Sequence, residues 1–359
     1  MTYLVAIVIL SGIGGALAVL LLLAGRYLCN YGPCSVQVND REPFVVDGGG
    51  KLLEALYARR IFIPSACGGQ GTCGFCRVQV LSGGGPVLPT ERLFLSEEEV
   101  ARGVRLACQV KVREALSVQV KPDYLDVREY RARVVSARLV TPDTREVRLR
   151  LLEPQALAFR PGQYVQVMVP GRREPTYRAY SIASPPSAAP DLELLVRRIP
   201  DGVGSGYLHR VDPGDEVVFT GPYGDFVLQP DAALVCVGGG CGMAPMRSIL
   251  RHVAETRPGQ PCWLFFGART AEQAMYRQDF EALSRQMPGL RVHYALSEPE
   301  TSAAWDGETG FIHESVARHL QDGDATQVFL CGPPAMITAA MAVLTAKGIP
   351  RERIFYDEF

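Results

Sequence analysis

The chain has 359 residues and a formal net charge of −1, so it is too long for one ordinary core and gives no electrostatic reason to propose a nucleic-acid partner. Two or three domains are therefore expected. The ten cysteines do not form a disulfide framework, because four of them stand at metal-ligand spacing.

The N-terminal segment is uncharged and apolar. Residues 3–25 are long enough to cross a bilayer as a helix, and the first charge is Arg26. A cleaved signal peptide is the alternative, but such peptides carry a basic n-region and a shorter apolar core. Positive charge on the C-terminal flank alone places the following residues in the cytoplasm. We therefore expect residues 1–26 to be a single-pass anchor in the inner (cell) membrane.

Four cysteines follow in a C-x5-C-x2-C-x31-C pattern: Cys67, Cys73, Cys76 and Cys108. Three thiolates from one tight loop and one from a distant strand suit a [2Fe-2S] cluster. The glycines within 68–74 permit positive φ angles and let backbone N–H groups turn towards the cluster. Structural zinc usually shows two C-x2-C knuckles, and disulfides are disfavoured in the cytoplasm. The pattern therefore indicates a [2Fe-2S] site.

The segments around this loop predict the order of a β-grasp domain. Residues 35–60 predict a strand pair and then a helix, whereas 77–83 and 104–112 predict strands. We expect a ferredoxin-type domain over residues 34–122.

The cysteine spacing and the sequence SACGGQGTCGFCRVQVLSGGG closely resemble the NADH-oxidising F subunits of the sodium-translocating NADH:quinone oxidoreductase family. The likeness runs from the anchor to the last residue and departs from the plant-type C-x4-C spacing. It implies oxidation of NADH through FAD and the cluster. It also implies membrane-embedded redox partners, with quinone as the final acceptor and sodium transport carried out by other subunits.

Short alternating runs broken by Pro and Gly predict an antiparallel barrel over residues 130–230. Within it, Arg178-Ala179-Tyr180-Ser181 resembles the RxYS signature of the ferredoxin-reductase superfamily. By that likeness Arg178 neutralises the FAD pyrophosphate, Tyr180 stacks on the isoalloxazine, and Ser181 hydrogen-bonds near flavin N5. An ordinary exposed strand pair is the alternative.

Three further sequence stretches occur in the same order along the chain as in that superfamily. They are Leu195-Val196-Arg197, Gly202-Val203-Gly204-Ser205 and Gly221-Pro222-Tyr223-Gly224. The second of them opens a predicted helix whose free N–H groups are suited to pyrophosphate oxygens.

Residues 231–359 predict a parallel sheet with helices on its faces, an α/β Rossmann-like NAD domain. An apolar strand, a glycine-rich turn and a helix place a dinucleotide pyrophosphate on a helix N-terminus. The residues expected there are Gly238, Gly239, Gly240, Gly242, Met243, Ala244 and Pro245.

Cys331-Gly332-Pro333 ends the last apolar strand, at the carboxyl edge where ligands of such sheets collect. The family resemblance places Cys331 beside nicotinamide C4, whereas a buried filler cysteine is the alternative. In the superfamily a terminal aromatic covers the flavin, so Phe359 is expected to shield it, with a frayed tail as the alternative.

Arg269 ends the strand after the glycine turn, where the adenosine ribose is read. An arginine there either binds a 2′-phosphate or stacks on adenine, and the resemblance favours NADH. Among the other cysteines, Cys29 and Cys34 are expected to be filler rather than ligands. Cys236, Cys241 and Cys262 are expected to pack.

The predicted architecture is therefore multidomain: a transmembrane helix, a β-grasp ferredoxin domain, a barrel FAD domain and a Rossmann-like NAD domain. Electrons are expected to pass from NADH to FAD to [2Fe-2S] to a membrane acceptor. One departure is the short segment PGRREPTY between Val169 and Arg178, where the family carries a long insertion. A membrane-tethered oxygenase reductase and a redox-sensing module without turnover are the alternatives.

Overall fold

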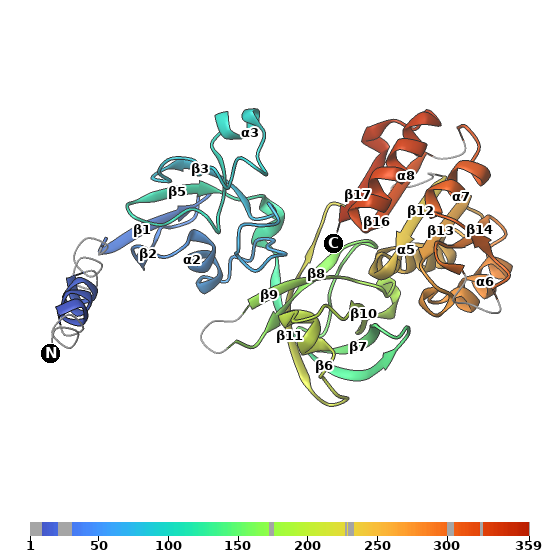
Figure 1. Cartoon of the computed structure of the whole chain (residues 1–359), viewed down its shortest axis with the longest axis horizontal. Coiled ribbons are helices and arrows are strands. Elements are labelled where there is room, and N and C mark those ends of the chain that lie inside the picture. The colour runs from blue at the N-terminus through green and yellow to red at the C-terminus, as the bar shows by residue number, and fades with distance from the viewer. Residues whose placement is uncertain are drawn as a thin grey trace. The chain divides into compact units, whose positions relative to one another are not determined.

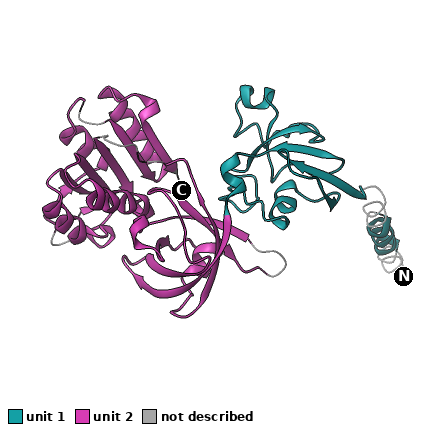
Figure 2. Ribbon diagram, turned by 180° about the vertical axis from the view of Figure 1, so that it is seen from behind, with its two compact units in different colours: residues 1–127 teal, residues 128–359 magenta. Residues whose placement is uncertain are grey.

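The computed structural model describes residues 9–20, 31–171, 176–226, 228, 233–299, 305–323 and 326–358. It divides the chain into two compact units, Met1–Val127 and Arg128–Phe359 (Figure 2). Residues 9–20 form a helix with exposed apolar side chains, and the rest of the predicted anchor lies outside the described residues. Of the helices that are described, none has the length and apolar character needed to traverse a bilayer.

The first unit contains a five-stranded sheet in the order β2-β1-β5-β3-β4 (Figure 1). The pair β1 and β5 is parallel and the other pairs are antiparallel, which is the β-grasp arrangement. Buried leucines of α2 pack into the core of this unit. The elements are β1 (Pro33–Val38), β2 (Phe44–Asp47), α2 (Leu52–Ala58), β3 (Arg77–Ser82), α3 (Glu97–Ala101), β4 (Val104–Leu106) and β5 (Leu116–Gln119).

The strand predicted over 104–112 is wrong in its extent, because β4 ends at Leu106. The amide of Ala107 donates to the carbonyl of Cys76, and the chain then turns at Cys108. The Cys108 side chain must reach the cysteine loop, so the chain has to leave the strand ladder before it. This explains why β4 ends earlier than predicted. The fifth strand, β5, was not predicted.

The second unit begins with a six-stranded antiparallel sheet in the order β10-β7-β6-β11-β8-β9. An antiparallel bridge between Ile182 and Leu194 joins the two edges, so the sheet closes into the predicted barrel. Its elements are β6 (Arg128–Leu139), β7 (Thr144–Glu153), β8 (Tyr164–Val169), β9 (Thr176–Ser181), β10 (Asp191–Arg197), α4 (Val203–Leu208) and β11 (Glu216–Tyr223).

The second unit ends with a parallel sheet in the order β15-β14-β13-β12-β16-β17. Apolar side chains bury α5 and α6 on one face of it and α7 and α8 on the other. Its elements are β12 (Leu234–Gly239), α5 (Met243–Thr256), β13 (Cys262–Ala268), α6 (Arg277–Gln286), β14 (Leu290–Leu296), β15 (Glu308–Thr309), α7 (Ile312–His319), β16 (Gln327–Gly332), α8 (Pro334–Ala346) and β17 (Ile354–Glu358).

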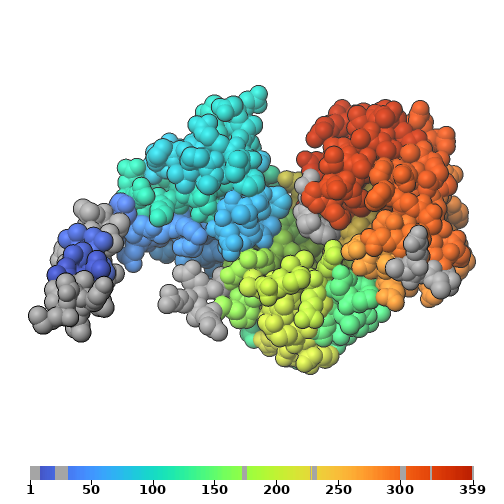
Figure 3. Space-filling model, viewed as in Figure 1, coloured from blue at the N-terminus to red at the C-terminus, as the bar shows by residue number. Residues whose placement is uncertain are grey.

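The barrel and the parallel sheet each have their own buried core, and they meet in a shared apolar cluster. Leu195 and Phe226 of the barrel segments are buried in the same cluster as the side chains of α5. Hydrogen bonds from Ser248 to the carbonyl of Ser184, and from Tyr276 to Glu146, cross the same junction. The green-to-yellow barrel segments and the orange-to-red sheet segments accordingly form one continuous body (Figure 3).

Candidate electron-transfer sites

The cysteine loop has the backbone that its glycines predict. Gly68, Gly69, Gly71 and Gly74 have φ angles of 67°, 83°, 77° and 70°. These values lie in the left-handed region, where residues with a Cβ pay a steric cost. The prediction of positive φ at the loop glycines is confirmed, and it explains how three cysteines can face one point.

The four thiols come together as two pairs. The Sγ atoms of Cys67 and Cys73 are 3.4 Å apart, and Cys76 and Cys108 are hydrogen-bonding neighbours. The hydrogen bond from Cys73 lowers the pKa of the Cys67 thiol to about 3, and that from Cys76 lowers the pKa of Cys108 to about 7. Two pairs of neighbouring thiols match a [2Fe-2S] cluster, in which each iron takes two cysteine thiolates, so these residues fit the group.

A buried ion pair lies behind the fourth cysteine. The side chains of Glu91 and Arg105 are 0% and 5% exposed, and Arg105 Nη2 lies 2.7 Å from Glu91 Oε2. Glu91 also accepts from the amide of Leu106, two residues before Cys108. Arg105 donates to the carbonyls of Gly84, Gly85 and Pro86. The pair therefore fixes a surface loop to the strand that leads to Cys108.

Two of the predicted flavin-binding segments meet in the barrel. A Cβ on Gly204 of α4 would lie 2.6 Å from the Tyr180 hydroxyl and 2.8 Å from Cγ of Arg178. Only a glycine permits this approach, which explains its place at the start of the helix. Arg178 is half-buried and donates to the carbonyl of Tyr177. Within the described parts of the chain it has no carboxylate partner, so its charge is available for an anionic ligand.

The other predicted flavin residues are placed as follows. Burial raises the pKa of Tyr180, and Ala179 and Ser181 are half-buried on the same strand. The hydroxyl of Ser205 accepts from the amide of Ile199 and so shapes the turn into α4, in which Val203 is exposed. Leu195 and Val196 are core residues of β10.

The next residue of β10, Arg197, lies elsewhere. It lines a cleft that also contains the glycine turn, and its Nε donates to Asp143 at 3.0 Å. Burial would raise the pKa of Asp143, but hydrogen bonds from Thr141 and Arg197 lower it below its usual value. The carboxylate is therefore ionised and holds the guanidinium in place. Asp143 and its threonine neighbours were not predicted, because only folding brings them to the cleft.

The cleft has a volume of about 460 Å³ and lies at the carboxyl ends of β12, β13, β14 and β16. Of the predicted residues, Gly239, Gly240, Arg269 and Pro333 line it together with Arg197. The other predicted residues of the glycine turn and of β16 are buried behind its surface: Gly238, Gly242, Met243, Ala244, Pro245, Cys331 and Gly332. The helix α5 begins directly after the glycines.

One glycine of the turn joins it to the neighbouring strand. A Cβ on Gly242 would lie 1.8 Å from the carbonyl oxygen of Cys331, so no larger residue fits without moving β16 or α5. The structure therefore couples the glycine turn directly to the Cys-Gly-Pro segment, which the sequence could show only as two separate motifs.

The cysteine of that segment is covered. Cys331 is 1% exposed, and burial raises the pKa of its thiol well above the usual value. Strand β17 runs parallel to β16 and places Asp357 opposite Cys331 and Glu358 opposite Gly332. The tail is thus a strand up to Glu358 rather than a frayed end, and the prediction for Phe359 itself lies outside the described residues.

An ion pair occupies the end of the cleft where the adenosine ribose was expected. Arg269 donates from Nε to Glu298 Oε1 at 2.9 Å and from Nη2 to Glu298 Oε2 at 3.2 Å. Both side chains are exposed, and the carboxylate follows β14, the next strand of the sheet. A cleft-lining arginine that is already paired to a carboxylate disfavours a further anion such as a 2′-phosphate.

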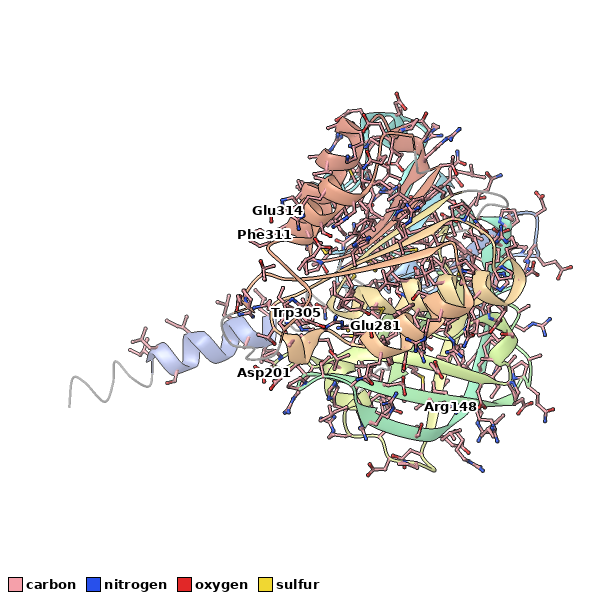
Figure 4. All side chains as sticks on the ribbon, turned by 90° about the vertical axis from the view of Figure 1, so that its right-hand side faces the viewer. Arg148, Asp201, Glu281, Trp305, Phe311 and Glu314 are labelled. Atoms are coloured by element: carbon pink, nitrogen blue, oxygen red, sulfur yellow. The ribbon has the colours of Figure 1, made fainter. Side chains whose placement is uncertain are left out.

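The loop between β15 and α7 forms another wall of the cleft. Phe311 and His313 line the cleft. Glu314 accepts from the amide of Phe311, and the two labelled side chains lie near one another in Figure 4. Upstream, Glu308 accepts from Ser315, lies 3.1–3.2 Å from two histidine nitrogens, and pairs with Arg318 at 2.7 Å.

The two histidines beside Glu308 are His293 and His319, whose rings stack at 4.2 Å. With Glu308 they place three possible metal-ligand atoms within 4.8 Å of one another. The carboxylate, however, is already used by an arginine and a serine, and stacked rings direct their lone pairs side by side rather than at one point. We interpret the cluster as a structural anchor for the cleft wall.

The remaining described cysteines are packing residues or neighbours of the cleft. Cys34 is buried in the first unit, and Cys236 and Cys262 are buried in the core of the second. Cys241 is half-buried beside Arg197 and Thr144, which differs from simple packing. Cys29 lies outside the described residues.

Comparison with known protein families agrees with this division of the chain. Residues 36–113 match the 2Fe-2S iron-sulfur cluster binding domain, 131–228 the oxidoreductase FAD-binding domain and 236–342 the oxidoreductase NAD-binding domain.

Two relatives align over nearly their full length. The F subunit of the Na(+)-translocating NADH-quinone reductase from Neisseria gonorrhoeae is 35% identical over 403 positions, which cover all of both chains. Its counterpart from Yersinia pestis is 34% identical and covers 96% of each chain. Because this chain has 359 residues, the Neisseria protein contains residues that this chain lacks.

Solved structures of reductases share the architecture. The Amycolatopsis cytochrome P450 reductase GcoB has a TM-score of 0.71 and 34% identity, covering 91% of this chain and 98% of its own. The ferredoxin reductase in carbazole 1,9a-dioxygenase has a TM-score of 0.69 and 28% identity over the same shares.

Proposed function

This chain belongs to the family of F subunits of the Na(+)-translocating NADH-quinone reductase, and we propose that it feeds electrons to a membrane-embedded partner that reduces quinone. It is an NADH-dependent oxidoreductase with FAD and a [2Fe-2S] cluster. Coupling to sodium transport, carried out by other subunits, is part of the proposal.

The observation that carries the proposal is the cleft of the second unit. Barrel residues Thr141 and Arg197 line it together with Gly239 and Gly240 of the parallel sheet. A flavin on the barrel and a dinucleotide on the sheet therefore belong to one compact unit, in which residues of both parts share an apolar cluster. Such an arrangement can hold a hydride donor against its acceptor, which is what the protein must supply.

Each half of the cleft has a separate task in this proposal. Arg178 neutralises the FAD pyrophosphate, Tyr180 stacks on the flavin ring, and Ser181 donates a hydrogen bond near its reactive nitrogen. The first turn of α5 holds the NADH pyrophosphate, with Arg197 oriented by Asp143 as the nearby cation. Bound FAD supplies the conversion from two-electron to one-electron chemistry.

Two predicted residues act at the reacting end. Cys331 lies beside the nicotinamide in this proposal, and the thiol is positioned by the β16 backbone that contacts Gly242. Phe359, which follows β17, shields the flavin until nicotinamide takes its place. The tail up to Glu358 supports this, because it is paired to β16 next to Cys331.

Electrons leave through the first unit. Cys67, Cys73, Cys76 and Cys108 hold the [2Fe-2S] cluster, which their pairing as two sets of thiols supports. The domains extend over residues 34–122, 130–230 and 231–359. Residues 1–26 form a single-pass anchor that keeps the soluble domains on the cytoplasmic side and beside the membrane partner.

A second function has its own support. The GcoB reductase is as similar in sequence to this chain as the F subunits are. The strands β8 and β9 are joined only by residues 170–175, where the family insertion would stand. A membrane-tethered reductase that supplies an oxygenase is therefore the second candidate. A redox-sensing module without turnover is a third, and steady NADH-dependent reduction of ferricyanide would exclude it.

The deciding experiment uses the full chain purified from membranes together with its partners. NADH should reduce the flavin first and the cluster second in anaerobic stopped flow, and quinone should be reduced only with the partners present. Chain lacking residues 1–26 should keep NADH:ferricyanide activity and lose quinone reduction. Co-purification with an oxygenase and no quinone reduction would establish the second candidate instead.

A further inference from the structure

The amide of Gln109 points at the cluster ligand that precedes it in the chain. Its Nε2 donates to Cys108 Sγ at 3.7 Å, a distance suited to a hydrogen bond to sulfur. A ligating thiolate has no proton to donate, so the contact requires that the amide nitrogen, and not its oxygen, faces the sulfur.

The cysteine loop keeps this amide in place from the other side. A Cβ on Gly71 would lie 2.4 Å from Gln109 Nε2, so the side chain packs directly on the loop backbone. Gly71 has a φ of 77°, and a larger residue there would be both strained and in collision with the amide. Gln109 therefore touches both a ligand sulfur and the loop that carries three other ligands.

A threonine holds the amide in this orientation. Thr90 Oγ1 donates to Gln109 Oε1 at 3.3 Å, which leaves the amide nitrogen to face Cys108. Thr90 is exposed, and its neighbour Glu91 is fully buried in the ion pair with Arg105. That pair also binds the carbonyls of Gly84 and Gly85, so the loop carrying Thr90 is held at both ends.

We propose that Gln109, oriented by Thr90, is a positioning residue that raises the reduction potential of the [2Fe-2S] cluster. An N–H donor directed at a ligand thiolate stabilises negative charge, and the reduced cluster carries one more negative charge than the oxidised one. The hydrogen bond therefore favours the reduced cluster and draws electrons out of the flavin. This inference rests on the ligand assignment proposed above.

The test is an EPR-monitored redox titration of the full-length protein. Gln109→Leu keeps the shape of the side chain and removes the donor. We expect the reduction potential of the cluster to fall by about 59 mV. For one electron, this shift makes the equilibrium constant for electron transfer from the flavin to the cluster about tenfold smaller. Thr90→Val should shift the potential in the same direction by less.

Gln79→Leu is the matched control, because Gln79 bonds the carbonyl of Arg102 in the same unit and touches no ligand cysteine. An unchanged potential in Gln109→Leu with a normal cluster spectrum would overturn the proposal. If the Thr90→Val protein had the same cluster potential as the Gln79→Leu control, Thr90 would not orient the amide. The same comparison tests the proposal if the Gln109→Leu protein takes up no cluster. Iron content and EPR of the wild type test the ligand assignment separately.

Discussion

Three of the four proposed cluster ligands lie in the loop 67–76, whereas the dinucleotide cleft takes its lining from segments between residues 141 and 339. The loop is a local structure, in which glycine angles and cysteine spacing bring three of the four thiols together. The cleft exists only after a barrel loop, the ends of four parallel strands and the β15–α7 loop have packed together.

This difference predicts two kinds of failure. A substitution of a loop cysteine should remove one cofactor and leave the second unit intact, because the loop belongs to the first unit. A substitution in the cleft should disturb both nucleotide binding and folding, because the same atoms serve packing and recognition. Single substitutions at each site can therefore show whether the two regions fail independently.

The largest effect is expected from Cys76→Ser. It removes one ligand of the proposed cluster, and a hydroxyl is a poor replacement for a thiolate on iron, so the [2Fe-2S] content should be lost. Flavin reduction by NADH should continue at nearly the wild-type rate, because it takes place in the other unit. Iron analysis, EPR and anaerobic stopped flow measure the two outcomes.

The matched control is Cys34→Ala, which alters a buried cysteine of the same unit outside the loop. It should retain iron. If Cys76→Ser also abolished flavin reduction, the two sites would not be independent and the contrast between them would be wrong.

Gly242→Ala is expected to have the next largest effect. The new Cβ meets the Cys331 carbonyl at 1.8 Å, so α5 and β16 must separate. Overpacking of this kind costs roughly 1–3 kcal/mol of unfolding free energy. Thermal unfolding should show the loss, and the Kd for NADH should rise with it, while the iron content stays normal. Gly259→Ala, with no atom near its Cβ, should change neither.

Sequence reasoning succeeded where a residue's neighbours along the chain decide its role. The positive φ of the loop glycines, the barrel and the alternating strands and helices follow from local pattern. The predicted extent of β4 was wrong. The strand ends early because Cys108 must reach a cysteine loop about thirty residues away in the sequence, and that requirement is not visible in the local pattern. The edge strand β15, only two residues long, has too little pattern to be predicted.

The residues that the sequence did not reveal are those whose partners are distant. Asp143 is an ordinary turn residue until folding places it against Arg197. Gln109 and Thr90 belong to no motif, and the Glu91–Arg105 pair looks like two surface charges. Arg197 was grouped with the flavin segments, yet it lines the cleft with the glycine turn. In each case long-range packing, rather than spacing, determines the role.

A smaller effect is expected at the adenosine end of the cleft. Glu298→Gln removes the carboxylate that pairs with Arg269 and leaves the arginine available for a 2′-phosphate. The ratio of kcat/KM for NADPH to that for NADH should rise about tenfold, because one charge-assisted contact replaces a repulsion. Glu281→Gln, which breaks a pair with Arg277 and alters no residue of the cleft lining, is the control. An unchanged ratio would mean that the ion pair does not select the dinucleotide.

The smallest effect should appear in the wall of the cleft as a dependence of stability on pH. Burial and the neighbouring His319 lower the pKa of His293 below its ordinary value of 6.5. The unfolded chain therefore takes up a proton at His293 before the native protein does, so native stability is lost as pH falls below 6.5. This stability is retained above pH 6.5. Glu308, whose pKa is lowered, makes the stability depend on pH only in a more acidic range.

His293→Asn tests this effect, because the shorter amide can still donate to Glu308 and does not titrate. The fall in unfolding temperature between about pH 7.5 and about pH 5.5 should become shallower, with little change at the upper pH. His252→Asn should make the same fall in unfolding temperature shallower by a separate amount, since burial also lowers the pKa of His252. If the two variants had the same slope as the wild type, neither ring would be held neutral by its surroundings. The cleft wall would still be fixed by Arg318 and Ser315, which hold Glu308 at every pH at which it is ionised.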